Sequence, residues 1–189
     1  VYAEHPLTME NLQAKYVSAK EILTHCSTVT NNEDMHNYII GKGEIGLPQR
    51  LNEINKVLNG TPFTVSYRVM NELTIYLAVL LDQAEEEGKE ITFDSFKQYV
   101  ETAIDRILLM KILPRVEGDD EMFHISDKER NANELSDQAE DGHEFTKLDW
   151  LKQIAPQHNE DNQNEYMAVD KLSEMIERLN RQSFTRFWP

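Results

Sequence analysis

Arg68 is a candidate for contact with a charged ligand. Apolar residues recur at helical spacing from Ser66 to about Glu87, which predicts a long helix with Arg68 and Tyr67 in its first turn. Arginine carries a permanent charge and a forked set of donors that suit phosphate oxygens, and a helix N-terminus also attracts anions. The alternative is a surface arginine that pairs with Glu72, four residues further along the helix. The sequence therefore indicates either an anion contact or an ion pair at this position.

Other patterns that could carry chemistry are weak. The sequence contains neither G-x-x-x-x-G-K-[ST] nor G-x-G-x-x-G, and Gly41-Lys42-Gly43 is too short to form a phosphate cradle. The six histidines are scattered, and Asp119-Asp120-Glu121 is more typical of a solvated loop than of a metal site. The single cysteine, Cys26, follows an amphipathic stretch and suits a small buried residue better than a nucleophile. We therefore predict no catalytic residue and no metal ligand in this chain.

Helices should position these side chains. Apolar residues recur at steps of three and four in six stretches, which lie within residues 12–23, 35–39, 51–58, 70–81, 96–108 and 172–179. Glycines at 41, 60 and 88 would end helices, Pro48 could begin one, and Pro114 should end another. Strand signals are weak, and the best candidates are 63–65 and 122–125. The sequence thus predicts a mainly α fold built as a small helical bundle.

The negative charge is concentrated in one segment. The 189-residue chain has a formal net charge of −15, and residues 117–165 hold 15 acidic and 4 basic residues. Such a composition, also rich in Asn and Gln, favours loops. We expect a helical bundle over 1–118, an acidic, loop-rich insertion over 119–165, and a C-terminal helix with an aromatic tail over 166–189 that packs back.

Composition also excludes several classes of protein. No stretch approaches the roughly 20 apolar residues of a membrane helix. The net negative charge argues against general binding to nucleic-acid backbones, which needs clustered Lys and Arg. The segment Val1–Leu7 lacks the basic head and apolar run of a signal peptide, so we expect a cytoplasmic location. Because the sequence does not begin with Met, we expect a piece excised from a longer protein.

Three stretches resemble segments of McrB-like AAA+ NTPases, the motor subunits of modification-dependent restriction systems. Residues 63–72 are similar to a lid pattern, F-x-x-x-Y-R-V-x-N-E. Residues 103–118 are similar to A-x-D … K-I-L-P-R-x-x-G, and residues 171–188 to K-L-x-x-M-x-x-R-L … G-F-T-x-F-W. The matches run in the family's order and cover roughly 47–118 and 168–189. The motif residues are Tyr67, Arg68, Asn71, Glu72, Asp105, Lys111, Pro114, Arg115, Phe184, Phe187 and Trp188.

The resemblance implies a helical lid and tail without the P-loop subdomain that hydrolyses the nucleotide. In the family, the Walker A lysine and Walker B acid lie on a larger α/β subdomain before the lid, and this chain has neither. Arg68 resembles a sensor-2 residue, which contacts nucleotide phosphates and reports hydrolysis to the lid by rigid-body rotation. The fragment alone would need no cofactor and catalyse no reaction, whereas the parent protein would use GTP or ATP with Mg²⁺.

The resemblance also implies partners. These are the P-loop core of the same polypeptide, further copies in a homo-oligomeric ring and a McrC-like nuclease, with no membrane and no direct nucleic-acid contact by this piece. The tail residues Phe184, Phe187 and Trp188 would pack on the bundle or on a neighbouring subunit. Two other interpretations remain open: a free-standing acidic helical adaptor that binds a protein through apolar groups, and a small metal-dependent enzyme that uses the carboxylates.

Overall fold

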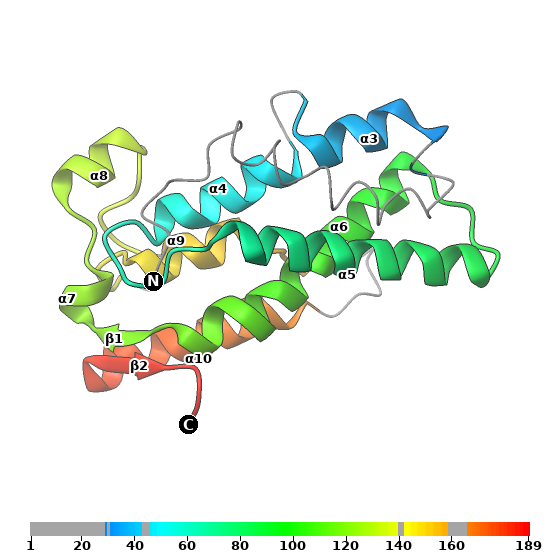
Figure 1. Cartoon of the computed structure of the whole chain (residues 1–189). Coiled ribbons are helices and arrows are strands. Elements are labelled where there is room, and N and C mark those ends of the chain that lie inside the picture. The colour runs from blue at the N-terminus through cyan, green and yellow to red at the C-terminus, as the bar shows by residue number, and fades with distance from the viewer. Residues whose placement is uncertain (1–28, 30, 43–45, 140–141, 159–165) are drawn as a thin grey trace. The chain divides into compact units, whose positions relative to one another are not determined.

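A computed structural model of the chain describes residues 29, 31–42, 46–139, 142–158 and 166–189 (Figure 1). The described part is mainly helical, so the predicted fold class is confirmed at that level. The chain divides into two compact units, each described below by itself. Unit 1 comprises the described residues of Val1–Asn55 and Val65–Ile107, and unit 2 comprises Lys56–Thr64 and Leu108–Pro189. The helix predicted over 12–23 and Cys26 lie outside the described residues.

Unit 1 begins, in its described part, with a helix whose two ends follow ordinary capping rules. Helix α3 (Glu33–Ile40) begins after Asn32, whose side chain accepts hydrogen bonds from two backbone N–H groups of the first turn. It ends at Gly41, which takes the left-handed conformation with φ 68°. Helix α4 (Leu47–Val57) follows, and its residues up to Asn55 belong to this unit. The predicted start near Pro48 and the predicted stop at Gly41 are both confirmed.

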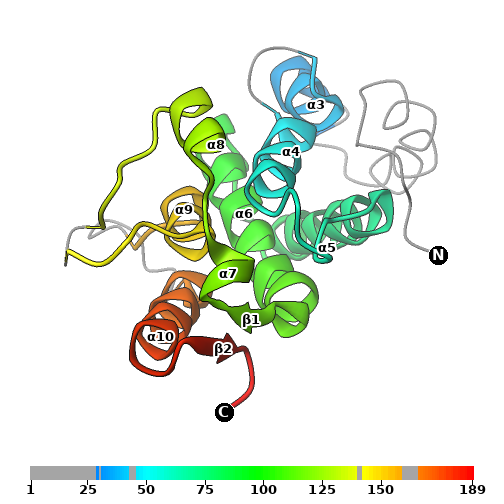
Figure 2. The same ribbon diagram turned by 90° about the vertical axis from the view of Figure 1, so that its left-hand side faces the viewer.

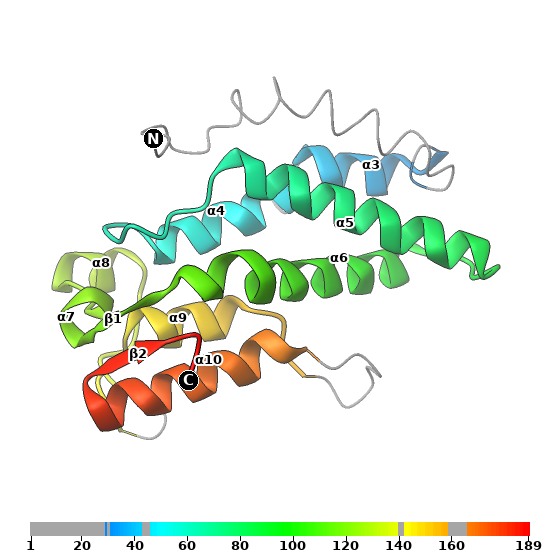
Figure 3. The same ribbon diagram turned by 60° about the horizontal axis from the view of Figure 1, so that its bottom comes forward.

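Helices α5 (Tyr67–Glu86) and α6 (Phe93–Ile107) pack against each other and form most of unit 1 (Figure 3). The inner face of α5 has the apolar stripe that its sequence predicts, including the fully buried Leu73, Leu77 and Leu81. In α6, Phe96 and Val100 are fully buried as well. Both helices thus form because one face of each leaves water, which is what stabilises most protein helices.

The larger segment of unit 2, Leu108–Pro189, begins where the helix type of the chain changes. A π-helix, η1 (Leu108–Ile112), follows α6 and leads into a 3₁₀ turn, η2 (Leu113–Arg115). Next come strand β1 (Glu117–Asp119), three short helices, and the long C-terminal helix with its strand. These are α7 (Asp120–Phe123), α8 (Asp127–Ala132), α9 (Lys147–Ile154), α10 (Met167–Gln182) and β2 (Phe184–Arg186).

Helix α10 is the central support of unit 2. It lies beside α9 and also contacts η1, so the predicted C-terminal helix does pack back (Figure 2). Strand β2 then turns back along α10 and pairs with β1 in a two-stranded antiparallel sheet. The turn is made at Ser183, a non-glycine residue in the left-handed conformation with φ 53°.

The predicted strands were wrong. Residues 63–65 form no strand, and Met122 and Phe123 lie in α7. The segment 119–165, which the composition predicts to be loop-rich, also contains the short helices α7, α8 and α9. Side chains of this acidic segment supply core residues, including Phe123, Leu148 and Leu151, which are fully buried. Burying a few apolar side chains stabilises these helices, although most residues of the segment are polar.

The contact-based boundaries of the units fall at residues 55/56, 64/65 and 107/108. They differ from the boundaries after 118 and 165 that the composition predicts, and those stay predictions.

Among the described helices, none combines the length and apolar character that a membrane-spanning segment requires.

Candidate functional site

Arg68 lies in the first turn of α5 and points into solvent. Its side chain is 82% exposed, and its Nε donates to Glu72 Oε1 at 3.2 Å. Tyr67 beside it is 41% exposed. Ser66, the N-cap residue, makes no side-chain hydrogen bond to the first turn. The ion pair with Glu72 that the sequence offered as an alternative is therefore present, and it leaves the guanidinium on an accessible surface.

Asn55 fixes the backbone immediately before α5. Its Nδ2 donates to the Val65 carbonyl oxygen at 2.9 Å, and its Oδ1 accepts from the Val65 N–H at 2.5 Å. One amide thus satisfies both main-chain groups of the residue that precedes the N-cap. Asn55 is a positioning residue that the sequence analysis missed. The available signal was an asparagine inside a helix, where its intrinsic propensity is poor.

The other residues of the first motif follow Arg68 on α5. Asn71 and Glu72 are half-buried, one and two helical positions beyond the buried Met70. Because Glu72 is less exposed than Arg68, it is the better-fixed member of the pair. The first turn of α5 therefore presents an aromatic ring and a guanidinium on a helix start that Asn55 holds.

The structure divides the second motif between the two units. Asp105 is 1% exposed in α6 of unit 1, and its Oδ2 lies 3.6 Å from Arg106 Nη1. Lys111 and Arg115 are exposed in unit 2, on η1 and η2 respectively, and Pro114 lies between them in η2.

The end of the second motif and the C-terminal tail meet in the small sheet. Gly118 lies opposite Thr185, and the pairs on either side are Glu117 with Arg186 and Asp119 with Phe184. A Cβ atom on Gly118 would stand 2.8 Å from Met122 Cγ, so the close approach of α7 requires glycine here. Two segments that the resemblance singled out separately are therefore hydrogen-bonded neighbours.

The aromatic tail is held by its backbone. Arg178 Nη1 donates to the carbonyl oxygens of Arg186 at 2.8 Å and Trp188 at 3.0 Å. The Phe187 ring contacts the Trp188 ring edge-on, with centroids 4.7 Å apart. Trp188 is nevertheless 63% exposed, and Phe184 is exposed on the outer face of β2. The tail packs on α10 of its own chain, while its two largest apolar faces remain in solvent.

A comparison with protein families matches residues 18–184 to a family described as a domain of unknown function, DUF8727. The chain belongs to this family. No curated protein and no solved structure matches it. The DUF8727 match includes Arg68, the second motif and the acidic segment 119–165, and it ends at Phe184, the first residue of β2.

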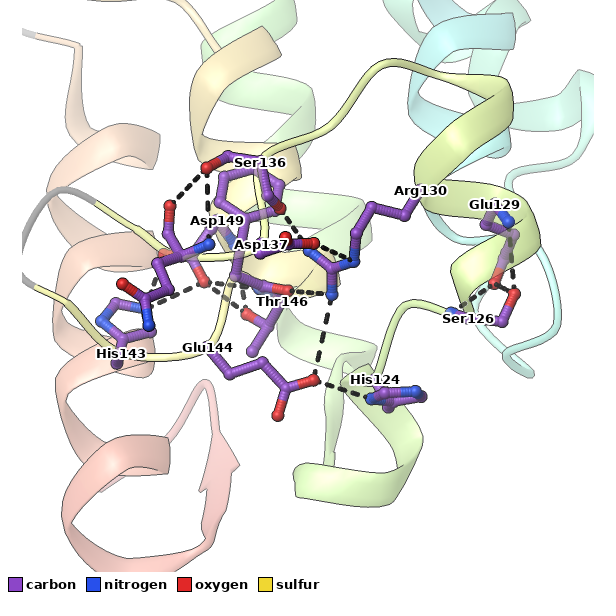
Figure 4. A network of polar contacts seen from close by, with 12 residues as sticks. His124, Ser126, Glu129, Arg130, Ser136, Asp137, His143, Glu144, Thr146 and Asp149 are labelled. Atoms are coloured by element: carbon purple, nitrogen blue, oxygen red, sulfur yellow. Dashed lines mark hydrogen bonds and ion pairs between the residues drawn. The ribbon is translucent and has the colours of Figure 1, made fainter.

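A polar network occupies the acidic segment of the DUF8727 domain (Figure 4). Its centre is Arg130, which is buried although it is charged. The guanidinium donates to the main-chain carbonyls of Ser136 and Phe145, and it lies 3.5 Å from Asp137 and 3.9 Å from Glu144. Arginine suits this role because its fork of donors reaches several acceptors at once. Arg130 thus holds a loop by its backbone.

Two histidines pair with carboxylates at the edge of this network. His143 Nε2 lies 3.0 Å from both Asp149 oxygens, and Asp149 Oδ2 also accepts from the backbone N–H of Thr146 at 2.9 Å. His124 Nδ1 lies 2.9 Å from Glu144 Oε1. Asp149 and Thr146 form the capping box of α9, so the contact between His143 and Asp149 lies at the start of that helix.

Lys147 joins three parts of unit 2. Its Nζ donates to Glu129 Oε1 at 2.9 Å and to the Asn59 carbonyl oxygen at 3.0 Å. Burial raises the pKa of Glu129, but hydrogen bonds from Lys147 and Ser126 outweigh that cost and hold the pKa below its ordinary value. Glu129 is in turn the N3 residue of the capping box of α8. The charges here are paired and structural.

None of the described residues forms a group of three or more His, Cys, Asp or Glu side chains that could hold a metal ion. In the sequence cluster 119–121, Asp119 instead caps α7 by accepting from the Met122 N–H at 3.0 Å. Among the described side chains, the exposed Arg68 guanidinium has the chemistry to contact an anion, and the exposed Trp188 ring has the chemistry to contact an apolar surface.

Proposed function

We propose that this chain is the helical lid and tail of a McrB-like AAA+ NTPase, with Arg68 as the nucleotide-sensing residue. In this proposal the P-loop core belongs to the same polypeptide, the parent protein forms a ring in the cytoplasm, and a McrC-like nuclease is a partner. GTP or ATP with Mg²⁺ would be bound chiefly by the core.

The accessibility of Arg68 carries this proposal. An arginine that meets a nucleotide on another subdomain must reach out of its own, and this guanidinium is 82% exposed in the first turn of a 20-residue helix. The helix start adds a favourable potential for anions, and no side-chain bond from Ser66 competes for its N–H groups. A buried Tyr67–Arg68 pair would have counted against the idea.

The glycine positions of the resembling patterns add support. Gly118 stands at the glycine of K-I-L-P-R-x-x-G, where a Cβ atom would clash with Met122. Ser183 stands at the glycine of G-F-T-x-F-W, in a left-handed conformation that favours glycine. Both patterns thus have glycine at a position where this backbone favours it, because of a close contact at 118 and a positive φ at 183.

The fit of a nucleotide to this chain is partial. The Arg68 guanidinium suits one phosphate group, which it could contact with two parallel N–H donors. Its role would be to bind and orient that phosphate and to move with the lid when the phosphate leaves. The remaining phosphate and metal contacts belong to the core subdomain in this proposal.

The deciding experiment is Arg68→Ala in the intact parent protein, with NTP hydrolysis and nucleotide affinity as readouts. We expect hydrolysis to fall by at least about tenfold, because an arginine that touches transferring phosphate is worth that or more. Arg181→Ala, which removes an exposed arginine of α10, is the matched control. Unchanged hydrolysis in the Arg68 variant, or NTP turnover by the isolated chain, would overturn the proposal.

One observation favours a second function, a protein-interaction adaptor. Trp188 is 63% exposed on a backbone that Arg178 fixes, and an exposed tryptophan held in place resembles the anchors of protein interfaces. The reading frame upstream of Val1 separates the two functions. A P-loop encoded there supports the lid, whereas a start codon directly before Val1 supports the adaptor.

A further inference from the structure

The turn that follows α4 contains the single Asn-Gly pair of the sequence, Asn59-Gly60. Both residues are exposed, and no other described part of the chain lies within 4 Å of the place that a Cβ atom on Gly60 would occupy. Asparagine before glycine is especially prone to deamidation, because a residue without a side chain lets its backbone nitrogen approach the asparagine amide. The turn therefore carries a candidate site of spontaneous modification.

The reaction is a ring closure followed by hydrolysis. The Gly60 backbone nitrogen gives up its proton to solvent and forms a bond to Asn59 Cγ, and the side-chain nitrogen leaves as ammonia. Water then opens the resulting succinimide at either of its two carbonyl groups, which gives aspartate or isoaspartate. In sum, one asparagine and one water give one aspartate or isoaspartate and one ammonia, so no reactant other than water is needed.

The folded turn opposes this ring closure. The Thr61 N–H donates to the Leu58 carbonyl oxygen at 3.1 Å, which places Asn59 and Gly60 at the two central positions. Gly60 has φ 79° and Asn59 has a negative φ. These features define a type II turn, in which the first central residue has ψ of about +120°. In an L-residue that ψ turns the next backbone nitrogen away from Cβ, whereas the five-membered ring needs both on one side, so the Asn59–Gly60 peptide must rotate before it can react.

Lys147 and Thr61 hold this peptide against rotation. The buried Lys147 ammonium donates to the Asn59 carbonyl oxygen at 3.0 Å, so rotation of the peptide breaks a charge-assisted hydrogen bond. Glu129 Oε1 fixes the same ammonium at 2.9 Å. Thr61 Oγ1 adds a second bond across the turn by donating to the Leu58 carbonyl oxygen at 2.7 Å. All of these groups belong to unit 2.

We propose that Asn59 is a site of deamidation and that Lys147 protects it. Lys147 is a positioning residue here, because it fixes the orientation of the peptide and takes no part in the ring closure. A hydrogen bond from a charged donor favours the bonded conformation by about tenfold or more, so the rate should be lowered by a similar factor. Modification would be lasting, since isoaspartate adds one carbon to the main chain and displaces the carbonyl that Lys147 binds. This inference is independent of the proposed function and needs no nucleotide.

The test follows the conversion of Asn59 by peptide mass spectrometry while the full chain is incubated at neutral pH. Lys147→Met should raise the rate at least about tenfold over that of the unaltered chain. Thr61→Val removes the hydroxyl at nearly constant side-chain size and should raise the rate as well. Isoaspartate should accompany aspartate at position 59, because the succinimide gives both products and direct hydrolysis of the side chain gives aspartate alone.

Two controls separate local protection from a general loss of stability. Lys128→Met removes an exposed lysine of α8, and Leu179→Ala destabilises unit 2 by removing a buried side chain of α10. Both should deamidate at the rate of the unaltered chain.

Three outcomes would overturn the proposal. A rate in Lys147→Met no higher than that of the unaltered chain, or one that Leu179→Ala equals, removes the protective role of Lys147. Aspartate without isoaspartate, or no product in any variant, removes Asn59 as a site of ring closure. If Lys147→Met fails to fold, the comparison of Thr61→Val with Leu179→Ala decides in the same way.

Discussion

Lys147 and Asn59 are 88 residues apart in the sequence, and the Lys147 ammonium donates a 3.0 Å hydrogen bond to the Asn59 carbonyl oxygen. The same ammonium binds Glu129 at 2.9 Å, and Lys147 is only 5% exposed. A buried charge is tolerated when its partners are all in place, and it becomes costly when one is removed. This lysine therefore joins the turn at Asn59, α8 and α9 within unit 2.

Replacing Lys147 with Met should destabilise unit 2 by about 1–3 kcal/mol, because the Asn59 carbonyl and the Glu129 carboxylate then lose a charged donor. Urea unfolding followed by tryptophan fluorescence in a Trp188→Phe background, which leaves Trp150 of α9 as the emitter, would measure the change. Lys128→Met is the matched control on α8, since Lys128 is exposed. Equal stability of the two variants would show that the Lys147 contacts carry no net energy.

Acid should weaken the same connection. The pKa of Glu129 is lower in the folded chain than in the unfolded one. A carboxylate of this kind stabilises the fold above its unfolded pKa, and the contribution disappears as the pH falls through its lower folded value. The loss of stability should therefore begin as the pH falls towards the ordinary glutamate pKa of about 4.3, and it should continue below that value because the folded pKa of Glu129 is lowered.

The variant Glu129→Gln should flatten this part of the stability curve, because the titrating group is gone. Thermal unfolding between pH 7 and pH 3 would show it as a smaller loss of Tm than in the unaltered chain. Glu121→Gln, an exposed change in α7, is the control. If both variants track the unaltered chain across the window, Glu129 does not provide the acid sensitivity.

Ser183→Gly should stabilise the turn between α10 and β2. Ser183 has φ 53°, and a left-handed conformation costs an L-residue about 1 kcal/mol that glycine does not pay. Gly88→Ala is the reverse substitution, because it places a side chain on a residue with a left-handed conformation. Gly88 has φ 71° and open space around its Cβ position, so only backbone strain is introduced, and stability should fall by about 1 kcal/mol. Shifts of equal sign in the two variants would refute the conformational argument.

The sequence predicts helices well where the signal is local. Helix α5 was expected from Ser66 to Glu87 and runs from Tyr67 to Glu86, because its apolar stripe and the glycine at position 88 both lie within the segment itself. The stop at Gly41 was equally visible, since a left-handed cap is a property of one residue.

Features that depend on distant partners were not visible. Strands β1 and β2 have three residues each, too short for an alternating pattern, and they exist because α10 returns the tail to Gly118. Arg130 donates its hydrogen bonds mainly to main-chain carbonyls. Every residue has such a carbonyl, so the sequence does not show which ones Arg130 binds. Pro114 correctly predicted the end of a helix, but the sequence did not show that a π-helix would precede it. For the candidate site, Arg68 was named in advance and Asn55 was not.

Arg68→Ala should leave the stability of the isolated chain within about 0.5 kcal/mol of the unaltered protein, because an exposed i, i+4 ion pair contributes little. Asn55→Ala should cost about 1–3 kcal/mol, since it strips both backbone groups of Val65 of their partner. Chemical denaturation of the two variants side by side would measure the contrast. This contrast matters for function: only if Arg68 is dispensable for folding can a loss of nucleotide hydrolysis in the parent protein be assigned to the guanidinium itself. A destabilisation of Arg68→Ala as large as that of Asn55→Ala would instead make Arg68 part of the scaffold of unit 1.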